Sequence, residues 1–345
     1  MGIVATGNVR LVSNSPQTPA ARRSPSRRCP PTRCNNRPKA HVDARCDTSG
    51  SMPDASAVQV GDIELVPLND GLCKLSPEFY IGLDFATHQE LLADDGRVHI
   101  PIGCFLLRTG GTTVLVDAGL GDVDVGWARG GELPAALRAS GTTPQDVDIV
   151  VCSHLHIDHI GWLVSDGRPF FPNATVRYGH ADWAQFVDAP GGESRTKEIM
   201  ETLSSAGRLE PLDGDDIAIA PGLTARHTPG HTPGHYGLVV SSGTDRALIL
   251  GDAVECPLQL EEPDFYAMSD VDPDLAARTR EALWRELEGS ETLMTAAHFP
   301  GLQFGRVLRG KGRRYFSADV DRFQPQPQSP ATSTDRAAGP SSAME

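Results

Sequence analysis

The sequence predicts an α/β fold in which helices cover β-sheets. Apolar and polar residues alternate along several short segments, of which 58–68 is the clearest, as they do on half-buried strands. Short apolar runs such as 148–152 and 247–250 are typical of strands buried on both faces. Helical patterns fall mostly between and after the strands, which favours covered sheets over a helical bundle.

The elements follow in order along the chain. Residues 104–108 and 113–116 are expected to form two strands joined at Gly110-Gly111, a pair typical of tight turns. Gly141 is expected to end the first helix, and Asp272-Pro273 supplies an N-cap and a first helical residue for the last. The further strands are expected at 148–152, 175–178, 217–220, 223–226, 236–240 and 247–250, and the helices at 133–140, 181–186, 194–205 and 272–287.

One folded domain, 52–322, is expected between two segments without apolar periodicity. Residues 1–51 are rich in Pro, Arg, Ser and Asn, and we predict that they are disordered because they cannot bury enough surface to offset their ordering entropy. The tail 323–345 has a similar low-complexity composition, and the same is predicted for it. The abrupt change at Met52 suggests the hypothesis that the leader is not part of the natural protein.

Charge and hydropathy exclude several classes of partner. The chain of 345 residues has a net charge of −14, and its first 51 residues are basic, so the rest is more acidic still. A body this acidic repels phosphate backbones, which argues against nucleic acid. No apolar run approaches the ~18 residues of a membrane span, and no apolar core follows the basic N-terminus as in a secretory signal. We expect a cytoplasmic protein with a small-molecule substrate and no membrane partner; a homodimer remains open.

Seven cysteines are scattered along the chain, three of them in the leader. Their number is odd and their spacing irregular, which fits reduced thiols better than a disulfide framework.

Three histidines and one aspartate lie within six residues, directly after the expected strand 148–152. Imidazoles are costly to bury unpaired, and clustered imidazoles repel one another when protonated. A divalent metal removes both problems, because neutral imidazole nitrogen binds zinc. In an extended turn alternate residues project the same way, so His154 and His156 are expected to share one ion, and Asp158 and His159 to face a second.

The pattern His-x-His-x-Asp-His after a buried strand resembles the signature of the metallo-β-lactamase superfamily. The resemblance covers roughly residues 58–305 and implies the four-layer αββα sandwich of that fold, with 52–322 as the catalytic domain. Asp117, in a strand that ends in Asp-x-Gly, would then support the site through hydrogen bonds.

The remaining ligands are implied by the same resemblance. The doubled motif 227–235 is similar to a family motif whose first histidine is a ligand, which selects His231 and leaves His235 structural and His227 peripheral; a shift of the repeat would select another of the three. Asp252, after the apolar run 247–250, matches the bridging aspartate, and His298 the last ligand.

The implied metal centre holds two divalent ions. His154, His156 and His231 would bind one ion, Asp158, His159 and His298 the other, and Asp252 would lie between them. Nitrogen and carboxylate ligands without thiolate suit Zn²⁺ best, with iron, manganese and cobalt left open. The implied reaction is hydrolysis of an ester-like bond (ester, lactone or phosphotriester) by a hydroxide bridging the two ions, with Asp158 as a proton shuttle.

The segment 251–259, together with Asp272-Pro273 and Thr279-Arg280, resembles the methyl parathion hydrolase-like and lactonase-like subgroup. Acyl-homoserine lactonases have a catalytic tyrosine three residues after the bridging aspartate, where this chain has Glu255. This departure weighs against lactone cleavage. Aromatic residues near the motifs either line a pocket for an apolar ester or pack in the core: Trp127, Trp162, Phe170, Phe171, Phe265 and Tyr266.

Other functions fit the fold less well. Persulfide dioxygenases use it with one iron ion and fewer ligands, and the presence of both His159 and His298 argues against that activity. Thioester hydrolysis stays open. Nucleases of the superfamily are disfavoured by the acidic body, and a non-catalytic binding module would be expected to lack ligands.

Overall fold

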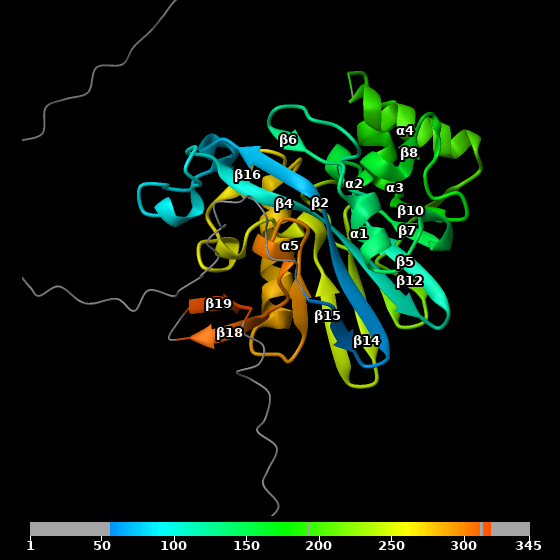
Figure 1. The fold of residues 1–345 in the computed structure, drawn as a ribbon. Coiled ribbons are helices and arrows are strands. Elements are labelled where there is room, and N and C mark those ends of the chain that lie inside the picture. The colour runs from blue at the N-terminus through cyan, green and yellow to red at the C-terminus, as the bar shows by residue number, and fades with distance from the viewer. Residues whose placement is uncertain (1–55, 192, 311–312, 319–345) are drawn as a thin grey trace, which may run out of the picture. The chain divides into compact units, whose positions relative to one another are not determined.

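Two β-sheets pack face to face, and helices cover their outer faces, in the part of the chain that the structure describes (Figure 1). The structure is a computed structural model and describes residues 56–191, 193–310 and 313–318. The arrangement confirms the four-layer αββα sandwich that the sequence resemblance implied. The disorder predicted for 1–51 and 323–345 concerns residues outside these ranges.

The first sheet has the strand order β1-β2-β4-β5-β7-β10-β11, with β6 paired to β2. Strand β7 is parallel to both β5 and β10, so the carboxyl ends of these three strands lie at one edge of the sheet. The strands are β1 (Val58–Val60), β2 (Ile63–Leu75), β4 (Val98–Thr109), β5 (Thr112–Val116), β6 (Ala128–Arg129), β7 (Ile149–Val151), β10 (Thr175–Gly179) and β11 (Leu209–Leu212).

The second sheet has the order β12-β13-β14-β15-β17. Strands β13 and β15 are both antiparallel to β14, and β17 is parallel to β15. The carboxyl ends of β13, β15 and β17 therefore also share one edge. The strands are β12 (Asp216–Ala220), β13 (Leu223–His227), β14 (Tyr236–Ser242), β15 (Asp245–Ile249) and β17 (Leu293–Thr295).

Helices α1 (Leu133–Ala139), α2 (Ile157–Ile160) and α4 (Ser194–Ser205) pack on the outer face of the first sheet, and α5 (Pro273–Leu287) packs on the outer face of the second. Within the described ranges, no helix is long and apolar enough to cross a membrane. A short helix, α3 (His180–Trp183), follows β10, and three two-stranded ribbons complete the structure: β3 (Tyr80–Ile81) with β16 (Tyr266–Ala267), β8 (Val164–Ser165) with β9 (Arg168–Pro169), and β18 (Arg306–Gly310) with β19 (Arg313–Ser317).

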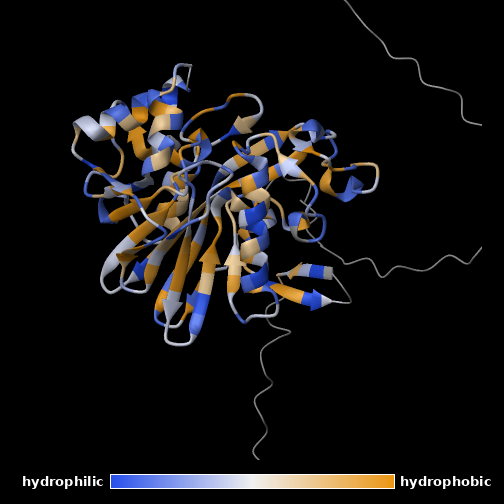
Figure 2. Ribbon diagram, turned by 180° about the vertical axis from the view of Figure 1, so that it is seen from behind, coloured by the Kyte–Doolittle hydropathy of each residue, from blue (hydrophilic) through white to orange (hydrophobic). Residues whose placement is uncertain are grey.

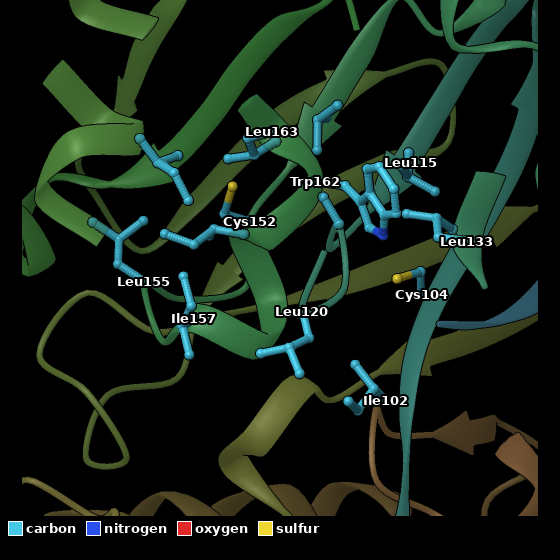
Figure 3. Packing of buried hydrophobic residues seen from close by; sticks show 14 of the residues in the cluster. Ile102, Cys104, Leu115, Leu120, Leu133, Cys152, Leu155, Ile157, Trp162 and Leu163 are labelled. Carbon is cyan, nitrogen blue, oxygen red and sulfur yellow. The ribbon is translucent and has the colours of Figure 1, made fainter. Parts of the chain in front are cut away.

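Apolar cores separate the layers. Leu65, Phe105 and Leu238 are among the buried side chains between the sheets, and the strands that carry this core stand out as apolar in Figure 2. A second cluster lies between the first sheet and its helices (Figure 3). It includes Leu155 and Ile157, which alternate with the motif histidines. Burial of these two side chains anchors the motif to the core and directs the intervening histidines away from it.

The predicted elements are largely confirmed, with differences at their ends. The first expected strand divides at Gly61, whose φ of 57° makes a turn between β1 and β2. Three strands of the two sheets, β6, β11 and β17, were not predicted. β6 and β17 are only two and three residues long, and β11 contains Pro211, which is tolerated because β11 is an edge strand. The helix expected at 181–186 is α3 followed by a π-helix, Ala184–Asp188.

A buried carboxylate, Asp70 in β2, joins three segments that are distant from it in the sequence. It lies at a β-bulge in β2, where the register shifts between Asn69 and Gly71. Its side chain accepts five hydrogen bonds, from the backbone N–H groups of Leu120, Gly121, Gly131 and Leu133 and from the indole N–H of Trp162.

We predict that Asp70→Asn lowers the free energy of unfolding by about 2 kcal/mol, because an amide NH₂ would face buried donors that then lack an acceptor. Urea denaturation of the variant measures this, with the exposed Asp94→Asn as the control. An unchanged unfolding midpoint for Asp70→Asn would contradict the prediction.

Candidate metal centre

The predicted site residues lie at the carboxyl ends of strands from both sheets. His154 and His156 follow β7, and His156 is the N-cap of α2, which carries Asp158 and His159. The second sheet supplies the other three: His231 after β13, Asp252 after β15 and His298 after β17. The structure thus brings together all seven residues that the sequence analysis named.

Three histidines form the first cluster. His156 Nδ1 lies 2.9 Å from His154 Nε2 and 3.0 Å from His231 Nε2. Ligands of one tetrahedral zinc ion, with bonds of about 2.05 Å, are separated by about 3.3 Å, so this spacing suits a shared ion. His154 and His231 are fully buried, and His156 is half-buried.

Asp158, His159 and His298 form the second cluster. Asp158 Oδ2 lies 3.6 Å from His298 Nε2 and 3.8 Å from His159 Nε2. The backbone at His156 is extended, as expected, and the helix Ile157–Ile160 that follows it was not predicted. The change from extended backbone to helix after His156 is what turns Asp158 and His159 toward a different point from His154 and His156.

Asp252 lies between the two clusters. Its Oδ2 atom is 3.2 Å from His298 Nε2 and 3.3 Å from His159 Nε2, in the second cluster. The same oxygen is 3.5 Å from His231 Nε2 and 3.8 Å from His154 Nε2, in the first. Asp252 can reach this position because residue 251 is glycine. Gly251 has a φ of 53°, and a Cβ there would lie 2.7 Å from His235 Nε2, too close for any other residue.

Three of the clustered histidines, His159, His231 and His298, have a hydrogen-bond partner on Nδ1, the ring nitrogen that points away from the centre. Asp117 Oδ2 lies 2.9 Å from His159 Nδ1, and Asp270 Oδ1 lies 2.9 Å from His231 Nδ1. His298 Nδ1 lies 2.7 Å from the carbonyl oxygen of Pro101. These bonds place a proton on Nδ1 and direct the Nε2 atoms toward the centre, where each can bind a cation once it has lost its own proton.

The doubled motif resolves into three different environments. Only His231, of its three histidines, is in a cluster. His235 Nε2 accepts the backbone N–H of Asp252 at 3.0 Å and so helps to hold that residue. His227 Nε2 lies 2.9 Å from the carbonyl oxygen of Pro233, away from the centre.

The buried charges act on one another strongly. Burial and the neighbouring His231 lower the pKa of His156 to about 3. Burial also acts to lower the pKa of His298, but Asp252 and Asp158 outweigh it and raise this pKa to about 9. Burial would raise the pKa of Asp252, yet His298 and His159 hold it well below its usual value. In the metal-free chain the second cluster therefore holds protons that a cation would replace.

Two observations test whether divalent cations fit these residues. His159 Nε2 and Asp252 Oδ1 are buried atoms without a hydrogen-bond partner, a costly state for polar groups. The donor set, imidazole nitrogen and carboxylate oxygen, is one that zinc and related ions accept. Both observations fit the binding of divalent cations.

Glu255 is also buried near the centre. Its Oε1 atom accepts a hydrogen bond from Ser269 Oγ at 3.0 Å and lies 3.7 Å from His231 Nδ1. Burial, and then the charge of Asp252, raise the pKa of Glu255 to about 7. This carboxylate contacts the side of His231 that also faces Asp270.

Sequence reasoning missed two buried acids that support the first cluster, Asp270 and Asp182. Asp270 is itself 3.3 Å from Arg280 Nη1. Neither acid stands in a motif, and each acts on a segment distant in sequence, so no local pattern could have revealed it. Of the aromatic residues considered for a pocket, Trp162, Phe171 and Phe265 belong to the apolar core.

Residues 101–288 match the sequence model of the metallo-beta-lactamase superfamily, and the chain belongs to that superfamily. An N-acyl homoserine lactonase of Bacillus cereus is 25% identical over a match of 224 residues that covers 59% of this chain and 85% of the relative. Two solved structures share the fold. AidC, a dizinc quorum-quenching lactonase, aligns with a TM-score of 0.68 at 22% identity, over 76% of this chain and 97% of AidC. AbOPH, a hydrolase, aligns with a TM-score of 0.68 at 25% identity, over 77% and 97%.

We predict that metal uptake by the metal-free protein releases more protons at pH 7 than near pH 9. The pKa of His298, about 9, keeps this imidazole charged at pH 7, and only neutral imidazole binds a metal ion. Calorimetric titration with zinc in buffers of different ionisation enthalpy counts the protons. His298→Gln should reduce the difference, and equal counts at both pH values in the unmodified protein would contradict the prediction.

Proposed function

We propose that this chain is a hydrolase that binds two divalent metal ions, with zinc the best fit, and cleaves an ester-like bond. The proposed ligands are His154, His156 and His231 for one ion and Asp158, His159 and His298 for the other, with Asp252 between. The observation that carries the proposal is the position of Asp252 Oδ2, within 3.2–3.8 Å of imidazole nitrogens from both clusters. A carboxylate in that position can bridge two cations, whereas one cation would leave the ligands of one cluster without an ion to bind.

When bound, two such ions supply a water molecule with a lowered pKa and polarise the oxygen of the bond to be cleaved. The residues of the chain hold this arrangement. Asp117 and Asp270 fix the orientation of His159 and His231, and His235 fixes the backbone of Asp252. Asp158 is the most exposed of the three second-cluster side chains, 15% accessible, and is the group we propose to carry a proton between the site and solvent.

An ester or lactone is the substrate class that the relatives favour, because the Bacillus cereus relative is an N-acyl homoserine lactonase and AidC is a lactonase. Glu255 is the feature that separates this chain from the lactonase pattern. A buried carboxylate at that position differs in charge and shape from a tyrosine, so lactones, open-chain esters and phosphotriesters all belong in a substrate panel, with thioesters beside them.

Oxidation of a persulfide at a single iron ion is the alternative activity on this fold. The presence of Asp158, His159 and His298 within one cluster, with Asp252 beside it, favours the two-ion hydrolase.

We also propose a cytoplasmic location and a small-molecule substrate. The four cysteines in the described part of the chain, Cys73, Cys104, Cys152 and Cys256, are free thiols, as expected in a reducing compartment. The net charge of −14 disfavours a nucleic-acid partner.

The first test of this function is His156→Ala. We predict that zinc content falls from about two ions per chain and that hydrolysis is lost, because one cluster keeps only two ligands. Metal analysis and a panel of lactones, aryl esters, thioesters and phosphotriesters measure both effects. His180→Ala, at an exposed histidine, is the matched control and should retain both.

Two results would overturn the proposal. One is an unmodified protein that binds no metal and cleaves no member of the panel in zinc-supplemented buffer. The other is uptake of oxygen with a persulfide by a protein that holds one iron ion, which would establish the dioxygenase instead.

Asp158→Asn provides a separate test of the proton-carrying role. In excess zinc we predict a fall in turnover of about 10²- to 10⁴-fold, the usual contribution of a positioned acid or base. Turnover on the best panel substrate is measured together with metal content, so that loss of an ion is distinguished from loss of proton transfer. Full turnover with both ions bound would exclude Asp158 from this role.

A further inference from the structure

Asp182 is a buried carboxylate that contacts both loops of the three-histidine cluster without contacting its imidazoles. The residue is completely buried and lies in α3. Its Oδ2 atom accepts the backbone N–H of Leu155 at 3.2 Å and the Thr232 hydroxyl at 2.9 Å. Its Oδ1 atom accepts the backbone N–H of Gly234 at 2.6 Å.

The two loops come from different sheets. Leu155 lies between His154 and His156, in the loop that follows β7 of the first sheet. Thr232 directly follows His231, in the loop that follows β13 of the second sheet. One carboxylate oxygen therefore links the part of the cluster that each sheet supplies.

The contact leaves little freedom for the second loop to shift. A Cβ atom on Gly234 would lie 2.9 Å from Asp182 Cγ, and a Cβ on Gly179 would lie 1.8 Å from the carbonyl oxygen of Gly234. The backbones thus meet at a distance that only glycine permits. The side chain of Asp182 is therefore in direct contact with the loop that carries His231.

The segment that contains Asp182 also contacts an imidazole of the cluster. The π-helix Ala184–Asp188 follows α3 directly, and the Phe186 ring packs edge-on against the ring of His156, with centroids 5.1 Å apart. Two residues of this segment, Asp182 and Phe186, therefore contact the loops and one ring of the cluster.

The second cluster is held by other groups. Asp117 contacts His159, and the carbonyl oxygen of Pro101 contacts His298. Asp182 has no hydrogen bond to any residue of that cluster among its described contacts. Its hydrogen bonds go to the loops that carry His154, His156 and His231.

We propose that Asp182 is a positioning residue that sets the distance between the His154–His156 loop and His231, and through it the affinity of the three-histidine cluster for a divalent cation. The inference rests on the proposed function, since it requires that this cluster bind an ion. Asp182 is thus expected to control one of two metal affinities selectively.

The test is zinc titration against a competing chromogenic chelator, with four proteins. Asp182→Asn keeps the shape of the side chain but presents an NH₂ group to donors, and should weaken one of two zinc affinities by about 10- to 100-fold, as loss of a residue that orients a ligand typically does. Thr232→Val removes one of the three bonds and should weaken the same affinity by less. Asp188→Asn is the control: it is exposed, lies in the same segment, and accepts a hydrogen bond from the indole N–H of Trp183 and not from either loop of the cluster in the described part of the chain.

Cobalt substitution supplies a second readout, because the visible spectrum of bound Co²⁺ reports ligand geometry. The spectrum of the first cluster should change in Asp182→Asn and Thr232→Val and stay unchanged in Asp188→Asn. Should Asp182→Asn fail to fold, Thr232→Val carries the test on its own.

The outcomes separate this inference from the proposed function. Selective weakening of one ion supports it. If the unmodified protein binds two zinc ions and both variants bind them with unchanged affinities, or weaken both ions equally, the role of Asp182 is wrong while the two-metal function stands. If the unmodified protein binds no zinc, both are wrong.

Discussion

One oxygen atom, Asp252 Oδ2, lies within 3.2–3.8 Å of four imidazole nitrogens, and this convergence constrains the whole sandwich. Two of the imidazoles, of His154 and His159, belong to the first sheet, and those of His231 and His298 belong to the second. Each cluster takes two residues from the first sheet and one from the second. The sheets must therefore pack in a fixed relation, which the apolar core between them provides because close-packed interiors resist displacement.

Buried carboxylates fix the loops that no strand can hold. Asp70, Asp117 and Asp182 each accept backbone N–H groups at the strand ends, where ordinary loops would be mobile. The arrangement has a cost. Burial raises the pKa of Asp70, and raises that of Asp182 to about 6, in spite of the hydrogen bonds that both accept. The charged forms of Asp70 and Asp182 are therefore less stable in the folded chain than in water, which lowers the free energy of unfolding, while their hydrogen bonds hold the loops at the site in one geometry.

The site residues that could be predicted from the sequence are those that lie together in short motifs, and those missed make their contacts with segments far away in the chain. The run His154–His159 and the doubled motif around His231 are short, so their residues could be named in advance. The bond from Asp270 to His231 and the bonds from Asp182 to Leu155 and Thr232 join segments far apart in the chain, and nothing in their local sequence marks them. The same holds for β17, whose strand character comes from its parallel partner β15 rather than from its own three residues.

The division of each cluster between two sheets has a consequence for kinetics. Neither sheet carries a complete cluster, so an ion meets its full set of ligands only after both sheets have formed and docked. Interactions made this late are absent from a transition state in which docking is incomplete, and they slow unfolding without accelerating folding. Cation supply would then govern how long the native chain persists once formed, and would leave the rate of reaching that state unchanged.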